Sequence, residues 1–259
     1  MLARGDRRLV CPRAHSFDLA RSGYINLLQP QDKRSKQPGD TTDAVAGRRR
    51  LHDRGVTAPL LAAIADLSAP GSSDIVLDAG CGDGFYLGTL AQQLCFEAHG
   101  VDISVPAIDA AARRYPVCQW IVANADRFIP FAARSFSLLL SITARMNPAE
   151  FHRVLRPEGR LLVAIPAPDD LIELRGTGRD RVTRTVETFD PYFTLTAQRR
   201  ITTTADLDAA AVQDVLHSIY RPLHANPVEA KQVTLSLDLL LLHRRELHHH
   251  PPNHKWDNV

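Results

Sequence analysis

From Ser73 onward, short apolar runs alternate with amphipathic segments of helical length. This alternation predicts a parallel sheet whose strands are connected by helices. Ser104 and Pro148 are residue types that often stand at the beginning of a helix. The expected strands are 75–77, a strand that ends with 99–101, 119–122, 136–141 and 160–165, and the expected helices are 85–94, 104–114 and 148–155.

The pattern is less regular on either side of this unit. Upstream, residues 57–67 predict a helix that is broken at Pro70-Gly71. Downstream we expect a strand at 193–199, a helix at 206–218 and a last strand at 233–242. With these two strands the predicted fold is an α/β, Rossmann-like fold with a mostly parallel, seven-stranded sheet.

The two ends of the chain differ from its centre in composition. Upstream of about Pro38 there is no periodicity, and Cys, His, Pro, Gly and basic residues predominate, which is typical of a small separate module. The segment from His248 to His254 is of low complexity, as disordered tails often are. We therefore expect a small module over residues 1–37, a large domain over 38–245 and a disordered tail over 246–259.

Composition excludes several classes of protein. Of the 259 residues, 44% are hydrophobic and 23% are charged, as in ordinary globular proteins. Because no run of about 18 apolar residues exists, a membrane span is not expected. The first residues carry no apolar signal region, which favours a cytoplasmic location. The four cysteines are too few and too scattered to predict a disulfide framework.

The net charge of +2 is unevenly distributed. Residues 1–55 contain 12 Lys or Arg and six Asp or Glu, so the rest of the chain is mildly acidic. A basic N-terminal part suggests that a polyanion docks there. An ordinary solvated surface would give the same count, and both interpretations stay open at this point.

A glycine-rich loop follows the first expected strand of the large domain. Its spacing is Asp-x-Gly-x-Gly-x-Gly, from Asp78 to Gly84. A dinucleotide-binding G-x-G-x-x-G would need glycine where Phe85 stands, and no G-x-x-x-x-G-K-[ST] for phosphate is present. An acid directly before the glycines suits a ligand with a cationic amino group, because it would repel a pyrophosphate.

Polar residues follow the next two expected strands. Asp102 ends the second strand, where a carboxylate accepts hydrogen bonds from both hydroxyls of a ribose. Asn124-Ala125 follows the third strand and is placed to contact an adenine edge. Together with the loop, this pattern describes a site for S-adenosylmethionine, the alternative being a tight turn with ordinary acids at strand ends. The predicted cofactor-binding residues are Asp78, Gly80, Gly82, Gly84, Tyr86, Asp102, Ile103, Asn124 and Ala125.

The sequence excludes two kinds of methyl acceptor chemistry. Enzymes that methylate the amino groups of adenine or cytosine carry [DNS]-P-P-[YFW] after the fourth strand, where this chain has Ser141-Ile142-Thr143-Ala144-Arg145. Covalent methylation of cytosine C5 needs a nucleophilic cysteine, often after proline, and no Pro-Cys dipeptide is present. Neither absence identifies the acceptor.

A run near the N-terminus gives a more specific signal. Residues 10–28, Val-Cys-Pro-Arg-Ala-His-Ser-Phe-Asp-Leu-Ala-Arg-Ser-Gly-Tyr-Ile-Asn-Leu-Leu, lead into the basic segment from Lys33 to Asp40. With this run the chain closely resembles the RlmA-like 23S rRNA (guanine-N(1)-)methyltransferases, which include enzymes that confer macrolide resistance. The likeness continues through 46–55, the glycine loop, 107–116 and 154–159, and more loosely to 166–174.

The resemblance implies a class I methyltransferase domain preceded by a zinc-binding module that contacts RNA. The family binds zinc with Cys-x-x-Cys followed by Cys-x-x-x-His, and Cys11 and His15 match the second pair. Residues 1–10 look like the linker between the pairs, so we expect either an upstream start or an incomplete site. The implied partner is ribosomal RNA rather than DNA, and a homodimer stays open. The implied RNA-binding residues are Arg13, Arg21, Lys33, Arg34 and Lys36.

This chain departs from the family pattern on the acceptor side. The departures are Thr143-Ala144-Arg145, Gly55-Val56-Thr57, Glu158 and Asp169-Asp170, each at a place where the family commonly has other residues. Because of these departures, two alternatives stay open. The protein could methylate a small molecule, or it could be a non-catalytic protein that binds RNA or the methyl donor.

Methylation of guanine N(1) requires something to accept the N(1) proton. Asp40, Asp126 and His52 are candidates, although each is more typical of a structural or solvent-facing role, so the catalytic base is left unknown. The run Arg48-Arg49-Arg50 is either a second RNA contact or a helix surface, and we favour the surface.

Overall fold

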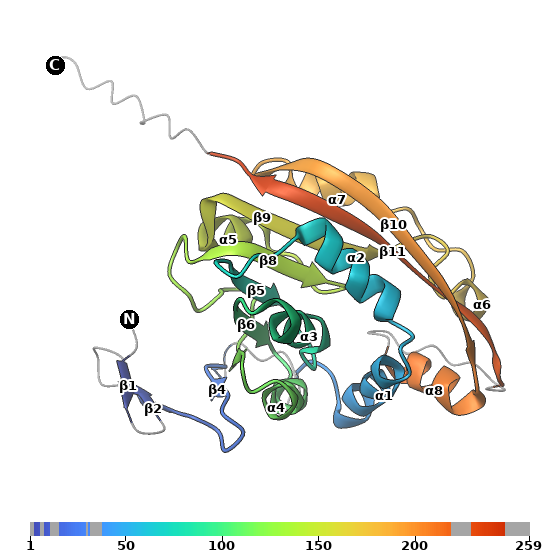
Figure 1. Cartoon of the computed structure of the whole chain (residues 1–259), viewed down its shortest axis with the longest axis horizontal. Helices are drawn as coiled ribbons and strands as arrows, with labels where there is room; N and C mark the ends of the chain where they lie inside the picture. Colours follow the sequence, from blue (N-terminus) through green and yellow to red (C-terminus); the bar gives the residue numbers. More distant parts are fainter. Residues whose placement is uncertain are drawn as a thin grey trace, which may run out of the picture.

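The computed structural model describes residues 3–5, 8–10, 16–29, 31, 38–218 and 229–246. Its centre is an eight-stranded sheet with the strand order β10-β11-β9-β8-β5-β6-β7-β4 and with helices on both faces (Figure 1). All seven strands predicted from the sequence are present in it, and the eighth strand, β4 (Ile25–Asn26), comes from the N-terminal segment.

The central strands run parallel, and the last two strands run antiparallel to their neighbours. Since the chain order proceeds outward from β5 in one direction and from β8 in the other, the sheet has its topological switch point between β5 and β8. Ligands of open α/β sheets bind at such a point, outside the carboxyl ends of the strands. The parallel strands are β5 (Ile75–Ala79), β6 (Glu97–Asp102), β7 (Gln119–Val122), β8 (Phe136–Ile142) and β9 (Leu155–Pro166), and the antiparallel ones are β10 (Phe193–Leu207) and β11 (Lys231–Arg244).

Alternate residues of each central strand enter one of two apolar cores. Val76, for example, packs with the helices on one face of the sheet, whereas Leu77 packs with those on the other. This period of two is the reason why the strands were recognisable in the sequence. The first core contains α2 (Ala58–Ser68), α3 (Phe85–Leu94) and α4 (Val105–Arg114), and the second contains α5 (Pro148–Val154) and α7 (Val182–Phe189).

The N-terminal segment forms part of the large sheet. Three short strands, β1 (Ala3–Gly5), β2 (Arg8–Val10) and β3 (Ser16–Asp18), form a separate antiparallel sheet. β4 then pairs with the edge strand β7, and the Ser22 hydroxyl donates to Asp109 on α4 at 2.6 Å. The boundary predicted after residue 37 therefore does not coincide with the edge of the large sheet.

The C-terminal elements differ in length from the prediction. β10 extends to Leu207 instead of 199, because its polar and apolar residues keep alternating and β11 pairs with it along its length. The predicted helix 206–218 begins later, as α8 (Ala209–Ser218), where the Asp208 carboxylate accepts a hydrogen bond from Ala211 N at 2.8 Å. The helices α1 (Thr42–Asp53), α6 (Ile172–Arg175) and α7 were not among the predicted elements.

The close packing of the glycine loop on the sheet predicts a stability effect. Gly84 has φ +74°, and a Cβ added there would lie 2.4 Å from the indole of Trp120 on β7. Gly55 has nearly the same φ, +75°, but faces open space. Gly55→Ala should therefore cost about 1 kcal/mol of unfolding free energy from backbone strain alone. Gly84→Ala adds overpacking and should cost about 3 kcal/mol in total.

Urea unfolding of the two variants beside the wild type checks this prediction. Because the two glycines have nearly the same φ, the difference between the variants reports the contacts of the added Cβ with Trp120 and Ala111. Equal losses in Gly84→Ala and Gly55→Ala would show that the glycine loop is not tightly packed on β7.

Candidate active site

The glycine loop and the end of β6 are joined by one carboxylate. Gly80, Gly82 and Gly84 all have positive φ, which lets the backbone turn sharply between β5 and α3. Asp102 accepts hydrogen bonds from Gly82 N at 2.9 Å and from Ser104 N at 2.8 Å. The carboxylate therefore holds two turns together at the carboxyl edge of the sheet.

Asp78, near the end of β5, is a buried acid that lacks a partner. It is 1% exposed, and one of its carboxylate oxygens, Oδ1, has no hydrogen-bond partner. Burial, and next the charge of Asp102, raise the pKa of Asp78 to about 8. Burial likewise raises the pKa of Asp102 and of Asp83. The edge of the sheet beside β5 therefore favours a ligand that brings positive charge.

Arg48 is a residue of this site that sequence reasoning missed. It projects from α1, and its guanidinium lies 3.2 Å from the position of a Cβ added to Gly82. It pairs with Asp40 at 2.6 Å and donates to the Ser218 carbonyl at 3.1 Å. The favoured interpretation of residues 48–50 as a helix surface holds for Arg49 and Arg50, which are about half exposed, and is wrong for Arg48. The amphipathic spacing of α1 was the available signal.

His52 and Tyr86 form an aromatic cluster next to the glycine loop. The His52 ring stacks on Phe85 with 3.9 Å between ring centroids, and Tyr86 meets both rings edge-on. His52 Nδ1 is 2.6 Å from the Thr57 hydroxyl. Burial, reinforced by the charge of Arg48, lowers the pKa of His52 to about 3. An imidazole with this pKa is uncharged at neutral pH, and the stacked ring of His52 serves packing.

The loop after β7 brings Asn124 and Ala125 to the same edge. Ala123 N donates to the Asp102 carbonyl at 3.0 Å, which places the ends of β6 and β7 side by side, with Ile103 half-buried at the turn after β6. The Asn124 side chain accepts from Asp126 N at 3.1 Å. The cofactor-binding residues predicted from three separate segments are thus brought together.

The loop after β8 lies against the glycine loop. A Cβ added to Gly80 would lie 2.4 Å from the Cβ of Ala144, so the two loops touch at this point. Arg145 pairs with Asp126 across the neighbouring loop ends at 3.5 Å. The segment in which this chain departs from the family pattern therefore forms one wall beside the predicted cofactor residues.

Several predicted residues fall outside the described part of the chain, namely Cys11, Arg13, His15, Lys33, Arg34 and Lys36. Arg21 is described, and it lies exposed in the turn between β3 and β4. Over the described ranges, no three His, Cys, Asp or Glu side chains gather in a way that could hold a metal ion. Over the same ranges, no helix has the length and apolarity that a bilayer crossing requires.

The fold and this edge of the sheet define a class of protein. The strand order, the three-glycine turn and an unsatisfied buried acid beside it fit the cationic amino group and the nucleoside of S-adenosylmethionine. They define a class I, S-adenosylmethionine-dependent methyltransferase. Two family models agree with this class: "Methyltransferase domain" matches residues 76–159, and "RlmA, N-terminal" matches residues 1–36.

Relatives of known name specify the family. The 23S rRNA (guanine(748)-N(1))-methyltransferase of Streptomyces fradiae is 36% identical over 240 residues, which is 88% of this chain and 84% of that protein. A provisionally named 23S rRNA (guanine-N(1)-)-methyltransferase of Micromonospora griseorubida is 36% identical over 65% of this chain and 62% of its own length. The chain belongs to the 23S rRNA (guanine-N(1)-)-methyltransferase family.

Solved structures with low sequence identity share the fold. A chain in the complex of the Haloferax volcanii Trm112 methyltransferase activator with a provisionally assigned methyltransferase superposes with a TM-score of 0.57. It is 19% identical, and the match covers 80% of this chain and 99% of that chain. A provisionally assigned methyltransferase from Bacillus halodurans gives a TM-score of 0.52 at 16% identity, covering 72% of this chain and 99% of that one.

Proposed function

We propose that this protein transfers the methyl group of S-adenosylmethionine to N(1) of a guanine in 23S rRNA. The observation that carries the proposal is the identity of 36% with the Streptomyces fradiae enzyme over 88% of the chain. The match of residues 1–36 to the RlmA N-terminal family supports it, because that match lies outside the methyltransferase domain.

In this proposal the donor lies over the carboxyl ends of β5, β6 and β7. Asp78 receives the amino group of the donor, since its Oδ1 has no other partner. Asp102 accepts hydrogen bonds from the ribose hydroxyls, because each carboxylate oxygen keeps a second lone pair beyond the backbone bond that it makes. Arg48 supplies the positive charge for the donor carboxylate beside Gly82.

The remaining predicted residues complete the donor site. Gly80, Gly82 and Gly84 let the donor approach the backbone, and Ile103 contributes an apolar contact at the turn after β6. Asn124 and Ala125 contact the adenine edge from the turn after β7. Tyr86 supports the glycine loop through its contacts with Phe85 and His52.

The acceptor nitrogen must meet the methyl carbon in line with the sulfur, so positioning is the main contribution of the protein. When bound, S-adenosylmethionine supplies the activated methyl group. Of the three candidate bases, His52 is enclosed in the aromatic cluster with Phe85 and Tyr86, and Asp40 is paired with Arg48. Asp126 is exposed on the acceptor side but is paired with Arg145, so the base stays unassigned.

The RNA reaches this edge next to the N-terminal module. A paired guanine does not present its N(1) edge, so the target lies in a loop or is flipped out of a helix. The exposed Arg21 is held beside α4 by the contact of Ser22 with Asp109. We propose that Arg13, Lys33, Arg34 and Lys36 contribute further phosphate contacts from the same module.

Methyl transfer to protein-free 23S rRNA tests the proposal. Purified protein is incubated with labelled S-adenosylmethionine and an unmodified 23S rRNA transcript, and the RNA is digested to nucleosides. We expect label in 1-methylguanosine and its loss when the modified guanine is replaced by adenine in the transcript. Label only in small molecules supports the small-molecule alternative instead, and RNA binding without any transfer supports a non-catalytic protein.

A further inference from the structure

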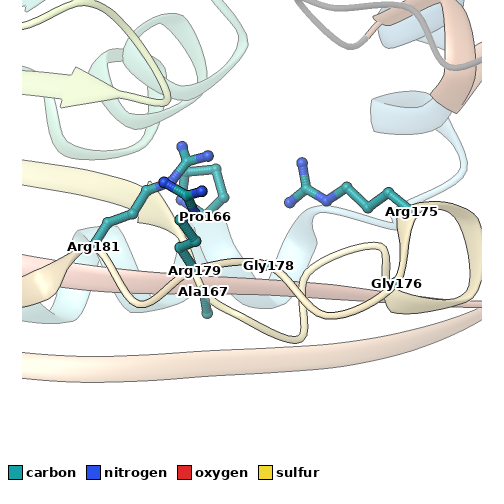
Figure 2. Close-up of a pocket in the computed structure, with 7 residues that line it drawn as sticks. All are labelled: Pro166, Ala167, Arg175, Gly176, Gly178, Arg179 and Arg181. Carbon is teal, nitrogen blue, oxygen red and sulfur yellow. The ribbon is translucent and has the colours of Figure 1, made fainter.

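A pocket of about 110 Å³ opens at the carboxyl end of β9. Its wall consists of Pro166 at the end of β9, the adjacent Ala167, Arg175 at the end of α6 and the loop that follows α6. Figure 2 shows Arg175 extending from one side of the pocket and Arg179 and Arg181 from the other. The volume holds about four water molecules, which is enough for a small anionic group but not for a nucleoside.

The charges in this pocket are only partly compensated. Arg175 pairs with Asp170 at 2.6 Å. In the described part of the chain, the side chains of Arg179 and Arg181 form neither an ion pair nor a hydrogen bond, although the charge of Arg181 acts on the carboxyl of Asp170. Three acids of the same segment accept hydrogen bonds elsewhere in the fold: Asp170 from Ser236 N, Glu173 from Thr234 and Asp180 from Val182 N. The buried Oδ1 of a fourth, Asp169, has no hydrogen-bond partner. The pocket therefore presents two guanidinium groups without a carboxylate partner.

The loop that carries these arginines is fixed by backbone contacts. Gly178 N donates to the Pro168 carbonyl at 2.6 Å, and Gly176, with φ +71°, ends α6. Asp170 also accepts from Nε of Arg175 through its carbonyl at 2.8 Å, so this side chain is held at two points. Arg175 is therefore ordered before an anion binds, which reduces the loss of conformational entropy on binding, whereas the exposed side chains of Arg179 and Arg181 are positioned only through their loop.

The pocket lies on the same edge of the sheet as the donor site. β9 is separated from β5 by β8, so the pocket is about 10 Å along the edge from the glycine loop. β4, which follows Arg21, lies at the opposite end of this row of strands. A chain of nucleotides that crosses the donor site from the N-terminal module therefore reaches the pocket next.

We infer that Arg175, Arg179 and Arg181, here called the arginine pocket, bind a backbone phosphate of the RNA beside the target nucleotide. The guanidinium fork matches phosphate oxygens, and phosphate contacts set the register of a nucleic acid on a protein. The inference rests on the proposed function and adds a second RNA contact on the far side of the donor site from the N-terminal module.

The test compares RNA binding by surface variants of the full chain. Arg179→Ala/Arg181→Ala removes both unpaired charges, whereas Arg179→Lys/Arg181→Lys keeps the charge and loses the fork. The matched control is Arg156→Ala, because Arg156 is exposed at the opposite end of β9. The Kd for a protein-free 23S rRNA transcript is measured over a series of salt concentrations, together with the Kd for S-adenosylmethionine.

We expect the double alanine variant to bind the transcript about 10-fold more weakly and with a salt slope smaller by about 1. The double lysine variant should keep the slope and lose less affinity, and Arg156→Ala should match the wild type. The Kd for S-adenosylmethionine should be the same in all four proteins, which shows that the fold is intact.

The outcomes separate this inference from the proposed function. Wild-type Kd and slope in the double alanine variant overturn the arginine pocket as an RNA site, even if the wild type methylates the transcript. A rise in melting temperature with inorganic phosphate that the double alanine variant loses, without an effect on RNA binding, assigns the pocket to a free anion and also overturns it. Failure of the wild type to methylate the transcript overturns the proposed function, and with it this inference.

Discussion

Asp102→Ala is expected to weaken the binding of S-adenosylmethionine by at least about 100-fold. The variant removes the acceptor for the ribose hydroxyls and also the bonds to Gly82 N and Ser104 N that hold the glycine loop. Each hydrogen bond to a charged group contributes about 1.5–3 kcal/mol, so the loss of two or more gives this factor. Isothermal titration of the purified protein with the donor measures it.

A second variant separates the loss of the ligand contact from a general loss of structure. Asp102→Asn keeps the shape of the side chain and one acceptor oxygen, so it should bind the donor more weakly than the wild type but better than Asp102→Ala. Both variants are melted without ligand to show that they fold. A donor Kd for Asp102→Ala within threefold of the wild-type value would remove Asp102 from the sugar site.

Asp78→Asn is expected to weaken donor binding and at the same time stabilise the ligand-free protein at pH 8. The Asn side chain cannot carry the negative charge that balances the amino group of the donor, and we expect a loss of about 10- to 100-fold in affinity. The stabilisation arises because a buried carboxyl with a pKa of about 8 opposes folding as soon as the pH favours its ionisation.

The direction of the pH effect follows from the raised pKa. Between the ordinary pKa near 4 and the folded value of about 8, folded Asp78 keeps a proton that the unfolded chain has released. This residue therefore makes the free energy of unfolding fall as the pH rises from about 4 to about 8. In Asp78→Asn this contribution is absent, so its advantage over the wild type should be largest at pH 8 and shrink toward pH 5.

Urea unfolding of wild type and Asp78→Asn at a series of pH values measures this difference. Asp66→Asn is a suitable control, because Asp66 is an exposed surface acid that pairs with Arg199. A constant difference between Asp78→Asn and the wild type from pH 5 to pH 8 would contradict a raised pKa for Asp78.

Local patterns in the sequence were enough to predict the parallel strands of the sheet and the glycine loop. The helix predicted at 85–94 is α3 with the same bounds, because a glycine turn precedes it and Cys95, in a left-handed conformation, ends it. The helix predicted from Ser104 begins where the Ser104 hydroxyl accepts from Ala107 N. In both cases the residues that begin or end the helix are its immediate neighbours in the sequence.

Other elements depend on partners that are distant in the sequence. The length of β10 is decided by its pairing with β11, and β4 is a strand because β7 offers a free edge. Arg48 is half-buried because α1 packs across the glycine loop and against α8, although its two neighbours in the run of arginines are exposed. The apolar spacing of α1 indicates which side of the helix faces inward, but it does not say which distant element that side will contact.

The sequence by itself determined the class of fold, the position of the glycine loop and the acids at the ends of β5 and β6, because strand alternation and turn chemistry are local properties. The tertiary structure decided which charges lack partners. It placed Asp78 beside Asp102 without a cation, and it left the side chains of Arg179 and Arg181 without a salt bridge while Asp170 paired with Arg175 and Asp180 accepted from Val182 N. Electrostatic compensation depends on distances of a few ångströms across separate elements, and only the folded chain sets those distances.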